Sequence, residues 1–162
     1  MSAVGEMLKN CKSISVDTGY HNVVALRKDF ELINDFIIEA FMKSEEFALL
    51  RKRMKKTQKQ MAKLLGVSVK AIHSYEQGWR SIPVHIERQF FFLLSKKNDQ
   101  AVDCWALLDC PEERKEKCPA WEFNAGKHCW FINGTICEGE SQVSWREKMV
   151  YCRSCKVFKK II

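Results

Sequence analysis

The stretch from Thr57 to Gly78, TQKQMAKLLGVSVKAIHSYEQG, constrains the fold of this chain more than any other. Thr57 and Gln60 form a capping-box pattern, which satisfies free backbone amides at the start of a helix. Gly66 stands where a helix end favours a left-handed residue, and Ser68 can cap a new helix two residues later. The apolar residues that recur at helical spacing between these signals are Met61, Ala62, Leu64 and Leu65. The pattern predicts two short helices joined by a tight turn.

The second predicted helix has an apolar face and a polar face. Ala71, Ile72 and Tyr75 are spaced to face the first helix, and Gly78 closes the second. The positions that point elsewhere are Val69, Lys70, His73 and Ser74. Two short helices at a steep angle, one with an exposed polar face, suit insertion into the major groove of DNA. The alternative is an ordinary helical hairpin whose polar face is only solvated.

Many positions within residues 44–95 are in register with one family pattern. They are Leu50-Arg51, Thr57-Gln58, Met61-Ala62, Leu65-Gly66-Val67-Ser68, Ile72, Tyr75-Glu76-Gln77-Gly78 and Pro83. Through them the chain resembles the Cro and phage-repressor (XRE) family of DNA-binding domains, which implies a mainly α, lambda-repressor-like helix-turn-helix bundle. The resemblance implies these contacts to DNA: bases read by Val69, Lys70, His73 and Ser74, and phosphates held by Gln58 and Arg80. Val69 and Ala71 stand where polar residues are common in the family, and Val69 can contact a thymine methyl group instead of a polar base edge.

The positive charge of the chain is concentrated in the same region. The net charge is +7, and residues 44–96 hold eleven Lys and Arg against four Asp and Glu. The segments before and after, residues 1–43 and 97–162, are nearly balanced. Such a distribution is expected where neutralisation of phosphates drives binding. Double-stranded DNA is therefore the expected partner.

The flanks of this domain are apolar. Residues 1–43 form an N-terminal extension with a predicted apolar helix at about residues 29–42, which either packs on the helix-turn-helix core or forms a homodimer interface. The run Phe90-Phe91-Phe92 cannot lie on one helical face, so part of it must meet that helix, the C-terminal region or a second subunit. The DNA-binding domain is expected at residues 44–96.

The chain has no secretion signal and no stretch long enough to span a bilayer, so we expect a cytoplasmic protein with no membrane contact.

Residues 104–162 form a separate, cysteine-rich module. They contain seven of the eight cysteines of the chain: Cys104, Cys110, Cys118, Cys129, Cys137, Cys152 and Cys155. Disulfides are disfavoured in a reducing cytoplasm, and seven thiols cannot all pair with one another. Metal ligation is the better explanation, because Cys152 and Cys155 have the spacing that lets two thiolates reach one ion. The remote Cys11 is expected to be a lone thiol, and His128 a bystander.

The module also has a faint internal repeat. Cys104-Trp105 and Cys129-Trp130 are each followed by another cysteine, and Cys110 and Cys118 each precede a proline. The arrangement resembles small "two-CW" cysteine-rich modules of regulators and signalling proteins. Thiolates suit zinc and an iron–sulfur cluster alike, and the Cys-Pro steps and surplus thiols favour the cluster. The tryptophans are expected to pack around the metal site, with short strands at residues 143–150 and 156–162.

These features favour a sequence-specific, dimeric transcriptional regulator whose module binds an iron–sulfur cluster or zinc and senses redox state, oxygen or metal. The alternative is an antitoxin-like or scaffold protein in which the module is a structural zinc knob for a protein partner. A redox enzyme using Cys152 and Cys155 as a dithiol is disfavoured, because the pair lacks βαβ surroundings. We therefore expect no enzymatic activity.

Overall fold

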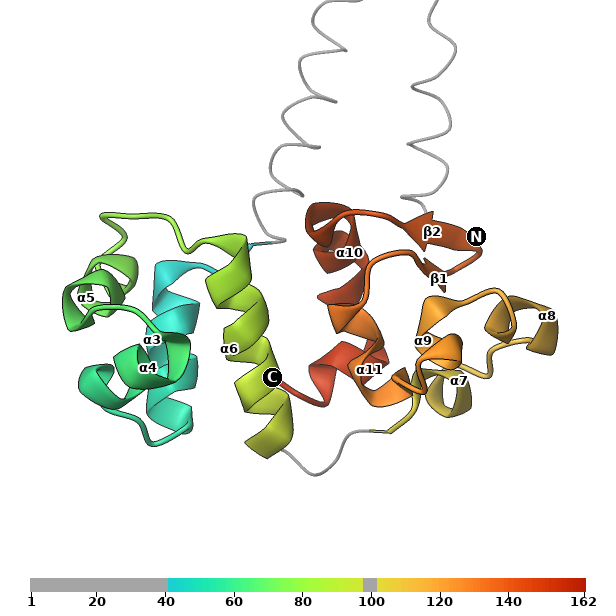
Figure 1. Ribbon diagram of the computed structural model, residues 1–162, viewed down its shortest axis with the longest axis horizontal. Coiled ribbons are helices and arrows are strands. Elements are labelled where there is room, and N and C mark those ends of the chain that lie inside the picture. The colour runs from blue at the N-terminus through green and yellow to red at the C-terminus, as the bar shows by residue number, and fades with distance from the viewer. Residues whose placement is uncertain (1–40, 98–101) are drawn as a thin grey trace, which may run out of the picture. The chain divides into compact units, whose positions relative to one another are not determined.

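The structure is a computed structural model that describes residues 41–97 and 102–162, all of which belong to one unit of the chain (Figure 1). The helix predicted over residues 29–42 lies almost wholly outside the described residues, and so does Cys11. The described chain is mainly helical, with one two-stranded hairpin near its C-terminal end. No helix of this part of the chain is long and apolar enough to cross a membrane.

Residues 41–97 form the helices α3 (Ser44–Arg53), α4 (Gln58–Leu65), α5 (Val69–Glu76) and α6 (Val84–Lys97). The predicted capping box is present, because the Gln60 amide donates to Thr57 Oγ1 at 3.2 Å and the Thr57 amide donates to Gln60 Oε1 at 2.9 Å. Gly66 ends α4 with φ +64°, a conformation that glycine adopts without strain. Ser68 Oγ then accepts the Ala71 amide at 3.1 Å and starts α5. The predicted helix, turn and second helix are confirmed.

The four helices share an apolar core. Phe47, Met61, Ile72 and Phe90 are each 0% exposed. The Phe47 ring lies 4.8 Å from the Phe90 ring and 6.1 Å from the Tyr75 ring, so α3, α5 and α6 meet around it. Burial of these side chains stabilises the angle between α4 and α5 more than the short helices could by themselves.

The region after residue 101 consists of short elements. They are α7 (Cys104–Leu107), α8 (Glu112–Lys115), α9 (Pro119–Glu122), the 3-10 helix η1 (Gly126–Phe131), β1 (Thr135–Cys137), β2 (Glu140–Gln142), α10 (Trp145–Cys152) and α11 (Lys156–Lys159). β1 and β2 are antiparallel, and Cys137 pairs with Glu140 across a turn at Glu138 and Gly139, both with positive φ. Glycine is favoured in such a turn because its two central residues are left-handed.

The sequence prediction of strands at residues 143–150 and 156–162 is wrong. These segments form α10 and α11, and the hairpin lies at residues 135–142 instead. Ser144 and Glu147 form a second capping box, in which Ser144 Oγ accepts the Glu147 amide at 3.2 Å. This local signal starts a helix and outweighs the strand preference of the valines that flank it.

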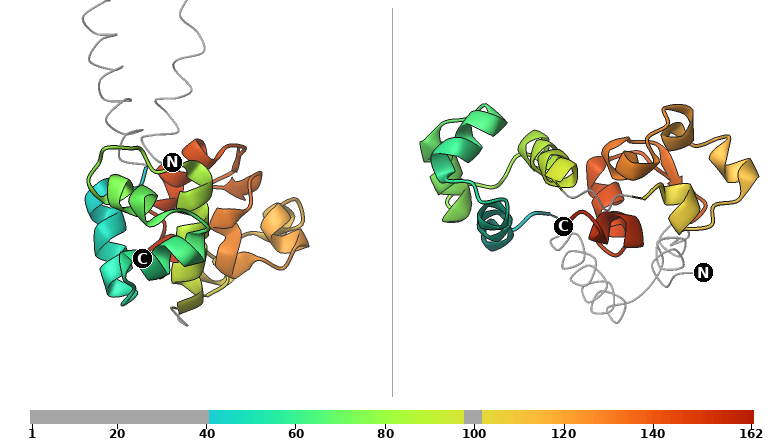
Figure 2. Two further views of the ribbon diagram at one scale, coloured as in Figure 1. Left: turned by 60° about the vertical axis from the view of Figure 1, so that its left-hand side comes forward. Right: turned by 90° about the horizontal axis from the view of Figure 1, so that it is seen from below.

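Helix α6 serves both parts of the described chain, and Figures 1 and 2 show it between α3–α5 and the helices α10 and α11. Its Phe90 faces Phe47, whereas Phe91 lies 4.9 Å from Phe158 and 6.3 Å from Trp130, measured between ring centroids. Phe92 contacts Phe131 of η1. The aromatic run therefore meets the C-terminal region, which was one of the three surfaces considered. Residues from both parts belong to one apolar cluster.

Candidate nucleic-acid interface and cysteine cavity

Three of the four predicted base-reading side chains are exposed on α5. Lys70 and His73 are exposed, and Val69 is 43% exposed. Ser74 is buried instead, and its hydroxyl donates to the Lys70 carbonyl at 2.9 Å. Ser74 lies three residues after Ala71, so it shares the inward face of the helix. The exposed surface of α5 thus presents one apolar, one cationic and one imidazole group.

An ion-pair network joins the three helices that carry this surface. Arg51 of α3 pairs with Glu76 at the end of α5 and donates to the Lys56 carbonyl at 2.7 Å. Gln58 Nε2 of α4 donates to Glu76 Oε2 at 2.8 Å, so the predicted phosphate contact is also a structural tether. Burial opposes ionisation of Glu76, but hydrogen bonds from Arg51 and Gln58 and the charges of Arg51 and Lys52 outweigh it. The pKa of Glu76 consequently lies below its usual value.

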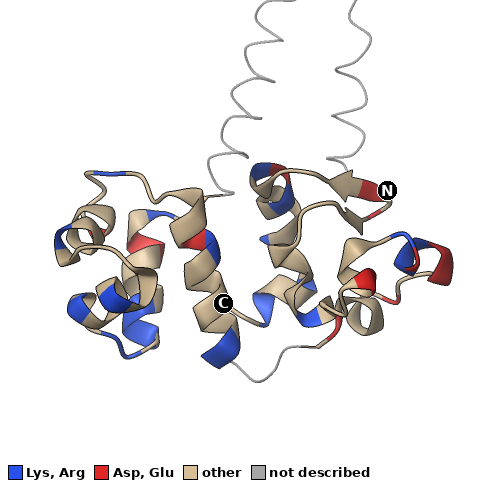
Figure 3. Ribbon diagram, viewed as in Figure 1, with Lys and Arg blue, Asp and Glu red and all other residues tan. Residues whose placement is uncertain are grey.

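The electrostatic surroundings of α5 suit a polyanion. Lys and Arg gather on α3, α4 and the turn between them (Figure 3). Arg80, the other predicted phosphate contact, is exposed in the loop after α5. Beside it, Trp79 is 70% exposed, and its ring lies 5.2 Å from the His73 ring. The aromatic contact holds His73 at the edge of the surface.

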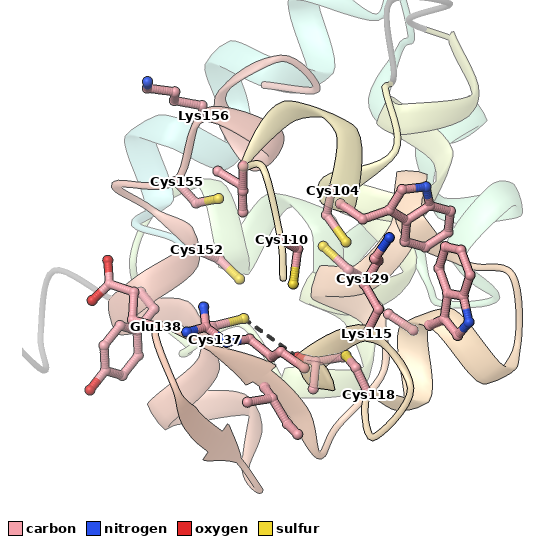
Figure 4. Close-up of a pocket in the computed structure, with 18 of the residues that line it drawn as sticks. Cys104, Cys110, Lys115, Cys118, Cys129, Cys137, Glu138, Cys152, Cys155 and Lys156 are labelled. Carbon is pink, nitrogen blue, oxygen red and sulfur yellow. Dashed lines mark hydrogen bonds between the residues drawn. The ribbon is translucent and has the colours of Figure 1, made fainter. Parts of the chain in front are cut away.

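The C-terminal region contains a cavity of about 410 Å³. All seven cysteines of the module line it: Cys104, Cys110, Cys118, Cys129, Cys137, Cys152 and Cys155. They come from the start of α7, the α7–α8 loop, the residue before α9, η1, β1, the end of α10 and the residue before α11 (Figure 4). Trp105 and Trp121 also line the cavity, whereas Trp130 and Trp145 do not and belong to the apolar cluster shared with α6. His128 does not line the cavity.

The thiols interact electrostatically with one another around this cavity. Each thiol affects the pKa of a neighbouring thiol or has its own pKa affected by it. The neighbours follow the order Cys104, Cys110, Cys118, Cys137, Cys155, Cys152, Cys129 and again Cys104. A hydrogen bond between Cys129 and Cys104 lowers the pKa of Cys104 and raises that of Cys129. Burial raises the pKa of Cys152 to about 12. Within residues 41–97 and 102–162, no three His, Cys, Asp or Glu side chains converge as closely as around a metal ion. To bind a metal ion, these thiols would have to lose protons and move closer together around it.

A buried lysine stands behind two of these thiols. Lys148 of α10 is 0% exposed, and its ammonium donates to Thr135 Oγ1 of β1. Burial raises the pKa values of Cys137 and Cys152, and the Lys148 charge partly offsets that effect. Lys148 does not stand out in the sequence as long as this segment is taken for a strand. In a helix, the spacing from Trp145 to Lys148 and Cys152 places all three on one face.

The wall of the cavity near Cys104 depends on a glycine. A Cβ added to Gly126 would lie 2.6 Å from two ring carbons of Trp105 and 2.7 Å from Asp103 Oδ1. The Trp105 ring packs edge-on against Trp121, with the ring centroids 4.8 Å apart. The bare backbone at residue 126 therefore lets Trp105 hold α7 against η1, where Cys104 meets Cys129.

A polar cluster links the cysteine region to α3 and α6. Arg153, which follows Cys152, pairs with Glu46 of α3, and its Nη2 lies 3.6 Å from Glu87 Oε1 of α6. Glu87 is 1% exposed and accepts the Trp145 indole N–H at 3.2 Å and the Met42 amide at 3.1 Å. Burial raises the pKa of Glu87 despite these opposing contacts. Sequence reasoning did not find this cluster, because no local spacing connects residues so far apart in the chain.

Comparison with known proteins identifies the class to which the first site belongs. Residues 47–83 match the family model described as helix-turn-helix. These residues are a helix-turn-helix domain of the XRE family, as the resemblance predicted, and such a domain implies DNA binding. DNA-binding domains of this kind are typical of regulators without enzymatic activity. No curated protein and no solved structure gave a match to the chain.

Proposed function

We propose that the protein is a sequence-specific transcriptional regulator whose cysteine module binds a thiolate-ligated metal centre, an iron–sulfur cluster or zinc. The observation that carries this proposal is the physical connection between its two sites. Helix α6 packs against the helix-turn-helix core through Phe90 and against the cysteine region through Phe91, and Cys152 of the cavity wall belongs to the same apolar cluster. A change at the thiols that senses redox state, oxygen or metal would thereby reach the helices that bind DNA.

The proposed contacts to DNA follow from exposure and charge. Lys70 and His73 offer hydrogen bonds to base edges from α5, and Val69 offers apolar contact to a thymine methyl group. Arg80 and Gln58 are assigned to phosphates, which position the domain without specifying sequence. Ser74 is the weakest of the assigned residues, because its hydroxyl is buried and bonded to the Lys70 carbonyl.

The proposed route between the sites begins next to Cys152. Arg153 contacts Glu46 on α3, Glu87 on α6 and the face of the Phe91 ring, whose centroid lies 5.2 Å from the guanidinium carbon. Metal binding draws on Cys152 and therefore fixes the end of α10, and with it Arg153. Loss of the metal would release that end and shift α6 relative to α3. We propose that the cognate site is read by two chains, as is common for this class of domain.

The assignment of base contacts is tested with a site selected by the wild-type protein from random DNA. The variant Lys70→Ala/His73→Ala should lose the preference for that site over scrambled DNA. The matched control is Lys159→Ala/His85→Ala, which also removes one lysine and one histidine side chain, but from exposed positions outside α5. Fluorescence anisotropy gives both affinities. Undiminished discrimination by the α5 variant would refute the assignment.

The shared apolar cluster also favours a second candidate. In it, the module is a structural zinc knob of an antitoxin-like or scaffold protein and presents a surface to a protein partner. Phe123, which is 66% exposed, supplies apolar surface on the module. The two candidates differ in their response to oxidant or chelator. When the metal is oxidised or removed, a regulator stays folded and its DNA affinity changes in proportion to metal occupancy. A structural knob unfolds under the same treatment, with no graded change in DNA affinity.

A further inference from the structure

We infer that the cavity takes a polynuclear metal–thiolate centre, with two or more thiophilic ions per chain, and that the buried ammonium of Lys148 is its built-in counter-charge. This inference rests on the proposed function, since it presumes that the module binds metal. It goes further by giving the nuclearity of the centre, its net charge and the residue that balances that charge.

The number of thiols argues against a single ion. A zinc ion in a structural site takes four ligands, which would leave three of the seven thiols around the same cavity unused. The cysteines do not divide into one group of four and a remote remainder, because all seven line the same cavity. An iron–sulfur cluster or a cluster of zinc ions with bridging thiolates can use such a set of thiols.

The size of the cavity agrees with this reading. A sphere with the radius of a Zn–S bond, about 2.3 Å, encloses about 50 Å³. The cavity holds about 410 Å³, which is several times that volume. Figure 4 shows the labelled thiols spread around the opening and not gathered at one point. The space fits several metal ions or a metal–sulfide core.

The charges around the cavity are those that an anionic centre needs. Four thiolates around one divalent ion already carry a net charge of about −2, and further thiolates add to it. Arg114, Lys115 and Lys156 line the cavity, against one carboxylate, Glu138. Lys148 is fully buried, and its ammonium bonds Thr135 Oγ1, which lies 3.7 Å from Cys137 Sγ. Cys152 follows Lys148 one turn further along α10.

Lys148 by itself is poorly compensated. Its ammonium donates to a neutral hydroxyl, and within residues 41–97 and 102–162 no carboxylate lies within ion-pair distance of it. Burying a charge without an opposite charge is costly, so buried lysines are normally paired. The opposite charge that the surroundings can supply is on the thiolates. A methionine at this position would be as long and apolar, so the retention of the charge requires an explanation.

The first measurement is made on wild-type protein purified without air, and it needs no variant. Elemental analysis, acid-labile sulfide and native mass spectrometry give the number of metal ions per chain. Two or more ions per chain are expected. One ion per chain would overturn the polynuclear centre but leave the proposed function standing. A folded protein that binds no zinc and no iron would overturn both.

The second measurement compares Lys148→Met with the matched control Lys159→Met, which removes a charge from an exposed residue that does not line the cavity. If Lys148 is the counter-charge, Lys148→Met should lose metal to a chelator at least tenfold faster than wild type, and the control should not. Lys148→Arg, which keeps the charge, should recover part of the loss. Equal rates for the Met variants and wild type would overturn the assignment of Lys148.

The sign of the stability change separates a counter-charge from a merely structural lysine. Without metal the negative charge of the centre is absent, so Lys148→Met should raise the thermal midpoint of the apoprotein. With metal bound the same change should lower the midpoint. A midpoint lowered equally in both forms would show that Lys148 only packs and hydrogen-bonds. If Lys148→Met does not fold, Lys148→Arg and the metal count still decide the proposal.

Discussion

The variant Glu87→Gln replaces one carboxylate oxygen of Glu87 by an amide group and so weakens its contact with the cysteine region. The two carboxylate oxygens of Glu87 accept from different parts of the chain, Oε1 from the Met42 amide and Oε2 from the Trp145 indole. Glutamine has one oxygen, so one of these buried donors must lose its acceptor. An unsatisfied buried donor costs about 1–3 kcal/mol.

The charge of Glu87 adds a second contribution. Removing one partner of a buried ion pair costs about 3–5 kcal/mol, but here the 3.6 Å separation from Arg153 is long and the pair is shared with Glu46. Glutamine is neutral, so the variant avoids the free-energy cost of burying a carboxylate. The same cost raises the pKa of Glu87. The two effects of the lost charge largely cancel. We expect a net loss of about 2 kcal/mol, set mainly by the unsatisfied donor.

Urea titration followed by circular dichroism measures this loss. Glu46→Gln is the control, because it removes a more exposed partner of the same arginine and should cost about 1 kcal/mol or less. Trp145→Phe removes the donor, so its combination with Glu87→Gln should cost less than the sum of the two single changes. A loss below about 0.5 kcal/mol for Glu87→Gln, or strict additivity in the pair, would refute this account.

Three further outcomes are expected. Thr57→Ala should destabilise the protein by about 1 kcal/mol in urea titration, and Thr57→Ser should restore most of it, since either hydroxyl caps α4. The pKa of Glu76 lies below its usual value of 4.5, so ionised Glu76 stabilises the folded state above that pH. This stabilisation is lost as the pH falls through the lowered pKa of Glu76. Glu76→Gln should therefore flatten the acid side of the stability–pH curve, and Glu45→Gln, at an exposed site, should not. Gly126→Ala should push Trp105 away from η1 and reduce the metal retained after gel filtration, a result that unchanged metal content would contradict.

The helix-turn-helix could be predicted from the sequence because its signals are local. Thr57 with Gln60, then Gly66 and then Ser68 each act within a few residues, and each forms the expected contact or backbone conformation. Their effect does not depend on how distant parts of the chain pack. The buried state of Ser74 was missed because the polar face was assigned by residue type and not by helical position.

The cysteine region was only partly predictable. Its boundaries and its thiols stand out by composition, but four-residue helices have no periodicity from which a face can be deduced. The meeting of all seven thiols at one cavity depends on how these short elements pack. The mistaken strand at residues 143–150 shows the cost of weighing valines above the Ser144–Glu147 signal. Neither Lys148 nor Arg153 could be assigned a role until α10 was known to be a helix.

Helix α6 also determines how this chain can be engineered. A DNA-binding domain that is stable by itself can be cut out and fused to another effector, but α6 has apolar side chains on both flanks. A chain ending at Lys97 would leave Phe91, which is now 0% exposed, without the rings of Trp130 and Phe158 that cover it. Such a fragment should associate or aggregate through that surface. The cysteine region therefore cannot be exchanged freely for another domain, and chimeras should keep α10 and α11 with the helix-turn-helix.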